Sequence, residues 1–354
     1  MNVPSSPTRS LADGRALPGI GPGRAHRIRA RLRDPQFWLR GSALLAFAIV
    51  VTAFALTSPL FLTVANLANV LQQSVVIGLL GFGLTIVLIA GGPDPIRGGL
   101  DLSVAANLGL CAAVFAVTQR DGYPALLSVA LTLATGATVG ALNAVAVIAL
   151  RIVPLLATLT TMNIAAGFEL VLTQNTPVQA NGALLAYLLR DGPFGVPHLA
   201  YALLLACAAF TVLVHETPFG LRLAAVGAHR DAARAAGIHG ARYVAASYVL
   251  CGIAAALAAL ASAALLSGSS PGAGDNLLAV VAAALLGVVF SRRLVPTIPG
   301  TLCAVLFIGV IVNGFQLDNL SSYYVNGVEG VLILFVVATT AIVRRRHGRS
   351  SAYD

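Results

Sequence analysis

The residues of this sequence that could bind a solute are few, and they lie inside or beside long apolar stretches. Five stand out, namely Asp101, Ser103, Asn143, Asn163 and Glu169. Polar groups at membrane depth are costly, so they usually face a bundle interior or water. Because charged groups are scarce in these stretches, a membrane path through them would suit a neutral solute better than an ion or an amino-acid zwitterion.

Each of the five also has a structural interpretation. Asp101 precedes an apolar stretch and is well placed as a helix N-cap; alternatively, "GGLDLS" lines a path and Asp101 and Ser103 order its gate. Asn143 and Asn163 suit interhelical hydrogen bonds or contact with a sugar hydroxyl. Glu169 either extends to the membrane surface or lines an outer vestibule.

A polar, arginine-containing stretch, "VGAHRDAARAAGIHGARY" (226–243), separates two long apolar runs. "RDAARAA" predicts two helical turns, with Asp231 in the first turn and Gly237 ending the helix. Arg234 lies within reach of a weak ion pair with Asp231. Isolated helices below about 12–15 residues are marginal in water. The stretch is therefore either a solvated loop or a helix that docks on another protein.

The four cysteines carry no metal-binding or paired spacing. They are interpreted as small buried residues inside apolar runs, and they are Cys111, Cys207, Cys251 and Cys303. Gly136 and Gly140 form a small-xxx-small pattern, which favours close packing between two membrane helices.

Composition places these residues in a membrane protein. Of 354 residues, 58% are apolar and 10% are charged, whereas soluble domains carry about 25% charged residues. Apolar runs near spanning length predict an all-α polytopic membrane protein with about ten transmembrane helices. The short eighth run would span only with help from its neighbours. The runs cover about 41–62, 66–90, 102–119, 123–150, 153–173, 197–214, 243–267, 276–290, 298–315 and 327–343.

The basic residues are all arginines, and their positions predict the orientation. With the N-terminus inside, only Arg120 and Arg190 fall outside, in agreement with the positive-inside bias. We therefore expect cytoplasmic N- and C-termini. The sequence pI of about 10.0 reflects topology on this interpretation, and nucleic acid is not an expected partner.

The chain divides into three expected parts. Residues 1–40 form an arginine-rich, disordered cytoplasmic leader, which serves as topogenic charge or contacts anionic membrane lipid. Residues 41–343 form the transmembrane domain, with the cytoplasmic segment 216–242 inside it, and residues 344–354 form a cytoplasmic tail. In the outer loops, "ALLAYLLR" (183–190) is expected to lie along the membrane surface, and "SSYY" brings two tyrosines to the interface.

The polar stretch also carries a family resemblance. "GAHRDAARAAGI" resembles the coupling-loop signature of permease subunits of bacterial ATP-binding cassette importers of the ribose and sugar type, typically Gly-Gly-Asn-x-Glu-Ala-Ala-Arg-x-x-Gly-Ile. Asp231 replaces the usual Glu, Ala228 the second Gly and His229 the Asn. The resemblance covers most of residues 60–343. Three more stretches match in family order: "GGLDLSV" (98–104), "GALNAVAVIALRIVPLLATLTTMNIAAG" (140–167) and "SSYYVNGVEGVLIL" (321–334).

This resemblance implies a permease subunit of the bacterial inner membrane that imports a monosaccharide of the ribose type. It implies a cytoplasmic ATPase, a second permease copy or paralogue, and a periplasmic sugar-binding protein that docks on loops 174–196 and 316–326. No GxxxxGK[ST] loop occurs in the sequence, so ATP is expected on the separate ATPase and this chain is expected to be no enzyme. The implied coupling residues are Gly227, Arg230, Asp231, Ala232, Ala233, Arg234 and Gly237.

Two alternatives stay open. A permease of the same superfamily could carry nucleosides or branched-chain amino acids. A stand-alone secondary transporter would be expected to repeat an intramembrane carboxylate or ion site in both halves. The only carboxylates expected at membrane depth are Asp101 and Glu169, and the second half has no matching partner for them. The chain departs from the family pattern at an insertion at 93–98, at Ala166 where Arg is common, and at 288–299, which has lost most glycines.

Overall fold

The computed structural model describes residues 35–92, 99–272, 276–291 and 293–318, together with 327, 330, 331 and 334. Long helices dominate these residues because the apolar runs contain few helix breakers and must satisfy their own backbone groups in lipid. The longer helices are α2 (Pro35–Thr57), α3 (Val64–Gly91), α5 (Val104–Arg120), α6 (Ala125–Ile148), α7 (Pro154–Thr173), α9 (His198–Thr211), α12 (Gly240–Leu266), α13 (Leu277–Phe290) and α14 (Ile298–Leu317).

Shorter elements connect these helices. They are β1 (Val178–Gln179), α8 (Ala183–Leu189), the 3-10 turn η1 (Pro193–Gly195), the π-helical turn η2 (Val212–Glu216), α10 (Pro218–Ala228), α11 (Arg230–Ala235) and β2 (Gly268–Ser269). Threonine side chains cap the starts of α10 and α14: Thr217 accepts a hydrogen bond from the Gly220 amide, and Thr297 accepts one from the Gly300 amide. Both are followed by a proline in the first turn, where its missing N–H is harmless.

Nine of the ten predicted apolar runs coincide with helices of the described residues. Six of these helices are long and apolar enough to cross a membrane, and three apolar helices are shorter: Ala43–Thr57 within α2, α5 and α13. The short eighth run is α13, of 14 residues. Helix α2 begins at Pro35, inside the predicted leader. The tenth run lies almost entirely outside the described residues, as do residues 1–34, the two interfacial tyrosines and the C-terminal tail.

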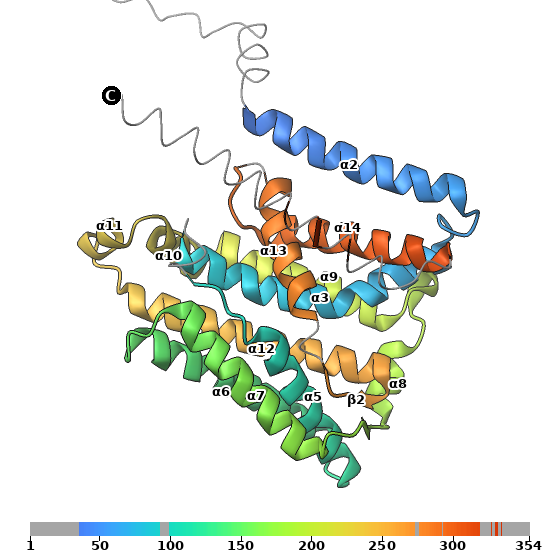
Figure 1. Cartoon of the computed structure of the whole chain (residues 1–354), viewed down its shortest axis with the longest axis horizontal. Coiled ribbons are helices and arrows are strands. Elements are labelled where there is room, and N and C mark those ends of the chain that lie inside the picture. Colours follow the sequence, from blue (N-terminus) through green and yellow to red (C-terminus); the bar gives the residue numbers. More distant parts are fainter. Residues whose placement is uncertain are drawn as a thin grey trace, which may run out of the picture.

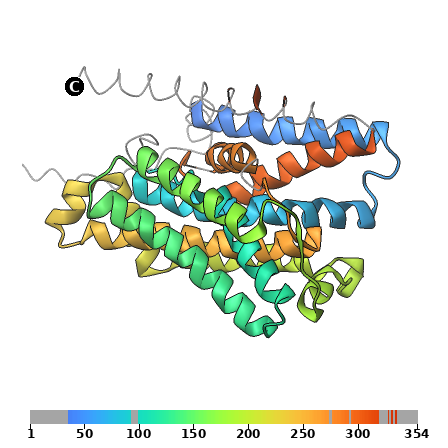
Figure 2. The same cartoon turned by 60° about the horizontal axis from the view of Figure 1, so that its bottom comes forward.

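Helix α12 forms the centre of the bundle. It packs most extensively against α6 and α3, and it also contacts α5. Helices α5, α6 and α7 pack on one another along one side of the molecule, whereas α2 lies on the opposite side beside α13 and α14 (Figures 1 and 2). Helix α3 is the most buried of the six long apolar helices.

Glycines allow a close contact between α6 and α12. A Cβ atom at Gly136 or Gly140 of α6 would overlap the carbonyl oxygen of Gly252 or Tyr248 on α12, respectively. The prediction that the two glycines of α6 mediate close packing is therefore confirmed, and α12 is the partner.

The two ends of the bundle differ in structure. At one end, α10 and α11 extend from the bundle, while α8 and the small sheet lie at the other end (Figure 1). There β1 pairs with β2 in antiparallel register, with Val178 opposite Ser269, and this pairing joins the loop after α7 to the end of α12. The predicted apolar run at 183–190 is the helix α8.

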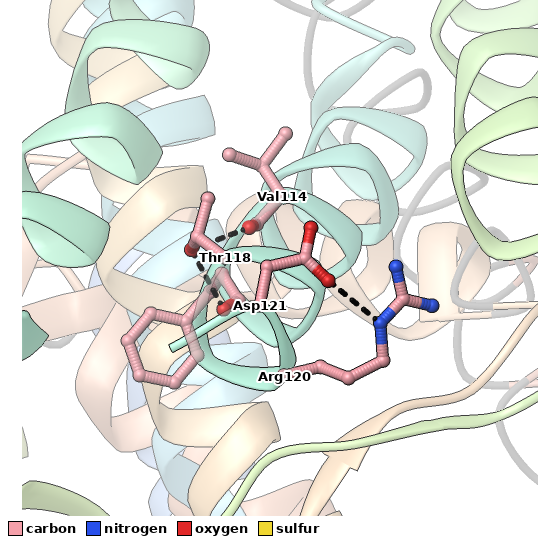
Figure 3. A network of polar contacts seen from close by, with 5 residues as sticks. Val114, Thr118, Arg120 and Asp121 are labelled. Atoms are coloured by element: carbon pink, nitrogen blue, oxygen red, sulfur yellow. Dashed lines mark hydrogen bonds and ion pairs between the residues drawn. The ribbon is translucent and has the colours of Figure 1, made fainter. Parts of the chain in front are cut away.

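Side-chain hydrogen bonds and an exposed ion pair lie at the C-terminal end of α5. The Thr118 hydroxyl donates to the carbonyl oxygens of Val114 and Phe115, at 2.8 and 2.9 Å. Arg120 and Asp121 form an ion pair at 3.0 Å, and both side chains are about half exposed (Figure 3). Such an exposed pair contributes about 0–1 kcal/mol, so it adds little to the stability of the fold.

Candidate functional site

A buried hydrogen-bonded group lies where the chain enters α5. The Asp101 Oδ1 atom accepts hydrogen bonds from the Ser103 amide at 3.0 Å, from the Ser103 hydroxyl at 2.6 Å and from the Asn143 side-chain amide at 3.2 Å. Asn143, on α6, also donates to the Ser103 hydroxyl at 2.7 Å. The Cys251 thiol of α12 hydrogen-bonds to the Asp101 carboxyl as well. We call these four residues the Asp101 cluster.

The cluster and the neighbouring Leu100 together join the start of α5 to three other helices. Asn143 provides the link to α6 and Cys251 the link to α12, while the Thr158 hydroxyl of α7 donates to the Leu100 carbonyl at 3.2 Å. Asp101 is only 2% exposed. Burial raises the pKa of its carboxyl, which lies in the connection between α3 and α5, and the hydrogen bonds from Ser103, Cys251 and Asn143 oppose that change. A carboxylate with several donors can stay charged when buried.

Of two sequence expectations for this region, the one for Asp101 needs correction and the one for Asn143 is met. Asp101 is not the N-cap residue of α5: Ser103 holds that position, and the Asp101 side chain bonds to the Ser103 amide two residues on. The interhelical hydrogen bond expected of Asn143 is confirmed.

Two buried polar groups of this region have no hydrogen-bond partner among the described residues. They are the Asn143 Oδ1 atom and the hydroxyl of Tyr248, which lies on α12 one turn before Cys251. The Tyr248 hydroxyl would be 3.3 Å from a Cβ atom at Gly99. Buried unsatisfied polar groups are uncommon in native structures, and each points to strain, bound water or function.

Asn163 and Glu169 of α7 lie apart from the cluster. Asn163 is exposed, and its amide donates to the carbonyl of Leu159 on its own helix at 2.9 Å. No interhelical hydrogen bond of Asn163 occurs among the described residues, so that expectation is not met there. An exposed amide on a membrane helix suits a surface that faces water or protein better than one that faces lipid.

Glu169 is buried instead of reaching the membrane surface or an open vestibule. Its side chain is 4% exposed, and its carboxylate packs against Gly109 of α5. The Oε1 atom has no hydrogen-bond partner among the described residues. Both interpretations from the sequence are therefore wrong for this conformation, because α5 offers a glycine at the level where the carboxylate projects.

A groove of about 330 Å³ lies between α5, α6 and α7, and it is apolar. Its three threonines, Thr135, Thr138 and Thr161, each donate to a carbonyl of their own helix. The groove has no Asn163 or Glu169 in its lining. It is suited to hydrocarbon rather than to a polyol.

The predicted cytoplasmic helix is α11, and Gly237 ends it as expected. Gly237 has φ +78°, its amide donates to the Arg234 carbonyl, and the Ile238 amide donates to the Ala233 carbonyl at 2.9 Å. This pair of bonds is a Schellman motif, in which the left-handed conformation favours glycine. The expected ion pair between Asp231 and Arg234 is absent from the described structure, where the two side chains are exposed.

The predicted coupling residues divide into two groups. Gly227 and Ala233 are buried against the rest of the molecule. The remaining five are exposed, and they are Arg230, Asp231, Ala232, Arg234 and Gly237.

Sequence reasoning missed several residues of this region. Cys251 and Tyr248 were indistinguishable from core residues, and no local signal marked Gly92 or His215. The imidazole of His215, in η2, accepts a hydrogen bond from the Ile298 amide at 3.3 Å and so joins the turn before α10 to the start of α14. Of the four cysteines, three are buried as predicted, whereas Cys303 is exposed.

Comparison with known proteins identifies similar chains. The family model described as branched-chain amino acid transport system / permease component matches residues 66–337. The ribose import permease protein RbsC of Escherichia coli (strain K12) is 33% identical over 316 residues, which cover 88% of this chain and 96% of that protein. RbsC of Bacillus subtilis (strain 168) is 34% identical over 296 residues, 83% of this chain and 90% of that protein.

A less similar relative is named for a different substrate. The autoinducer 2 import system permease protein LsrD of Photorhabdus laumondii is 28% identical over 313 residues, which cover 86% of this chain and 92% of that protein. No solved structure gives a significant match.

Proposed function

Because this chain belongs to the family of branched-chain amino acid transport system permease components, we propose that it is the membrane subunit of an ATP-driven importer of a monosaccharide of the ribose type. The two RbsC proteins compared above are named for ribose import and match over most of both chains. The chain is a multi-pass protein of the inner membrane, and the proposed topology has ten spans with both termini in the cytoplasm.

The observation that carries the proposal is the position of α11 at one end of the bundle. Its helix is short, ends in a Schellman motif and presents Arg230, Asp231 and Arg234 to solvent. A helix of six residues is marginal alone, and docking in a groove of an ATPase would stabilise it. The preceding helix, α10, packs on α3 and α12, so a force on α11 reaches the membrane helices.

The proposed path for the sugar lies outside the apolar groove. Asn163 is exposed on α7, and we assign it to a polar surface shared with a second permease copy or a paralogue. The Asp101 cluster is the proposed gate element: its polar atoms are buried in the present conformation and would meet a solute only after the helices move. Glu169 is left out of the open path because it is buried against Gly109.

At the opposite end, the loop that contains η1 is the proposed contact for a periplasmic sugar-binding protein. Phe194 is 90% exposed there and has φ +61°. The Tyr201 hydroxyl donates to the Pro193 carbonyl at 2.6 Å, which holds this turn in place. Exposed aromatic side chains on an ordered loop are suited to protein contacts.

Substrate competition tests the proposed class of solute. The importer is reconstituted from this chain, its ATPase and its sugar-binding protein, and uptake of labelled ribose is measured against an excess of unlabelled pentoses, hexoses, nucleosides and leucine. Competition by pentoses alone supports the proposal. Competition by nucleosides or leucine, with pentoses inactive, would assign the chain to another branch of its family.

A further inference from the structure

Two glycines join α10 to the end of α3 through their backbones. Gly227 lies in the last turn of α10, and Gly92 follows the last residue of α3. A Cβ atom at Gly227 would overlap the Ile89 carbonyl oxygen, and a Cβ atom at Gly92 would overlap the Gly227 carbonyl oxygen. The backbone of each glycine occupies the space that a side chain on the other glycine would need. The two backbones are therefore in direct contact, with no room for a Cβ atom between them.

The same contact requires glycine for a second reason. Gly92 has φ +86°, a left-handed conformation that side chains with a Cβ rarely adopt. By contrast, two contacts between α10 and α12 run through side chains: Arg222 donates to the Tyr243 hydroxyl at 3.3 Å, and the rings of Phe219 and Tyr243 are 5.7 Å apart. Long side chains of this kind can rearrange when a helix moves, whereas backbone in contact with backbone cannot.

Helix α3 continues this contact into the middle of the bundle. The Thr85 hydroxyl of α3 lies 2.7 Å from the Thr301 hydroxyl of α14. A Cβ atom at Gly83 would lie 3.1 Å from the Cα atom of Cys251, whose thiol bonds to Asp101. Densely packed interiors pass displacements on rather than absorbing them.

We propose that α3 transmits the movement of α10 to the Asp101 cluster, entering through the Gly92–Gly227 contact and leaving through the Gly83–Cys251 contact. Gly92 and Gly227 are then positioning residues: they touch neither ATP nor the sugar, and they align α3 with the segment that the ATPase moves. This inference rests on the proposed function, because it presumes that α10 and α11 receive force from an ATPase.

The first test is Gly227→Ala in the importer reconstituted from the full chain, its ATPase and its sugar-binding protein. The added methyl group displaces α10 from α3 but leaves the exposed surface of α11 intact. We expect the sugar transported per ATP hydrolysed to fall by about tenfold, a coupling loss within the usual range for linked sites. Gly41→Ala is the matched helical control, because nothing lies within 4 Å of its added Cβ.

Gly92→Ala tests the other side of the contact. Its control is Gly122→Ala, since Gly122 has a similar φ, +82°, with open space around it. The pair separates steric overlap from backbone strain: transport per ATP should fall for Gly92→Ala and stay near the wild-type value for Gly122→Ala. Full coupling in both Gly227→Ala and Gly92→Ala would overturn the inference. Sugar transport by the wild-type importer at the same rate with and without ATP would instead overturn the proposed function.

If the variants fail to assemble, hydrogen exchange on the wild-type importer tests transmission through α3 instead. The amides of residues 88–92 and 99–103 should change protection together with those of α10 when the ATPase binds ATP. A change confined to α10 and α11, with residues 88–92 and 99–103 unaltered, would contradict transmission through α3.

Discussion

The backbone of Gly140 on α6 lies directly against the carbonyl oxygen of Tyr248 on α12, in a space that a Cβ atom would fill. One turn away, Gly136 makes the equivalent contact with Gly252. These two contacts set the crossing of α6 and α12, and they bring Asn143 of α6 and Cys251 of α12 to the same carboxylate.

Replacement of Gly140 by Ala is expected to destabilise the protein. Overpacking a tight contact costs about 1–3 kcal/mol, so the thermal unfolding temperature of the purified protein in detergent should fall. The matched control is Gly41→Ala, where the new methyl group meets open space and alanine favours the helix. Equal unfolding temperatures for Gly140→Ala and wild type would show that α6 and α12 do not cross this closely.

Loss of the Asp101 carboxylate should also destabilise the bundle. Asp101→Ala leaves the Ser103 hydroxyl and the Ser103 amide without their buried acceptor, and each buried unsatisfied group costs about 1–3 kcal/mol. Thermal unfolding in detergent measures the loss. Asp121→Ala is the control, because it removes only an exposed ion pair. A variant at position 101 that unfolds at the wild-type temperature would contradict the cluster described above.

Charge reversal on α11 should weaken attachment of the ATPase. The double variant Asp231→Arg with Arg234→Asp keeps the chain inserted, since both side chains are exposed, but presents the wrong charges to the partner surface. Retention of the ATPase by affinity-tagged chain is the measurement. The control exchanges Arg120 and Asp121, an exposed pair at the end of α5. Unchanged retention and transport in the α11 variant would exclude this helix as the docking site.

A β-branched residue at Gly237 should impair coupling more than insertion. The φ of +78° is unfavourable for valine, so Gly237→Val disrupts the Schellman motif and the end of α11. Stimulation of the ATPase by the sugar-loaded binding protein should fall. Gly237→Asn, which tolerates the left-handed conformation better, should retain more stimulation. Full stimulation of the valine variant would show that this helix end plays no part in coupling.

The sequence was informative wherever local pattern decides structure. Apolar runs without helix breakers located the long helices, Gly237 marked the end of α11 because its conformation favours glycine, and the spacing of Gly136 and Gly140 indicated close packing. These features depend on neighbours in the chain or on the properties of lipid.

The remainder depends on residues far apart in the chain. Nothing local distinguished Cys251 from the alanines around it, although it bonds to Asp101. Glu169 was expected at an open surface, and it is buried because Gly109 of α5 leaves room for its carboxylate. Gly227 fitted a family signature for the partner-binding segment, yet its backbone faces α3. Only the packing of helices reveals such contacts.

The account depends above all on ATP-driven movement of α10 and α11. Uptake of labelled ribose into liposomes that contain this chain, its ATPase and its sugar-binding protein tests that dependence most directly. We predict uptake with ATP and none when the ATPase is omitted or ATP is replaced by a non-hydrolysable analogue. Uptake at an undiminished rate by the purified chain alone would contradict the account.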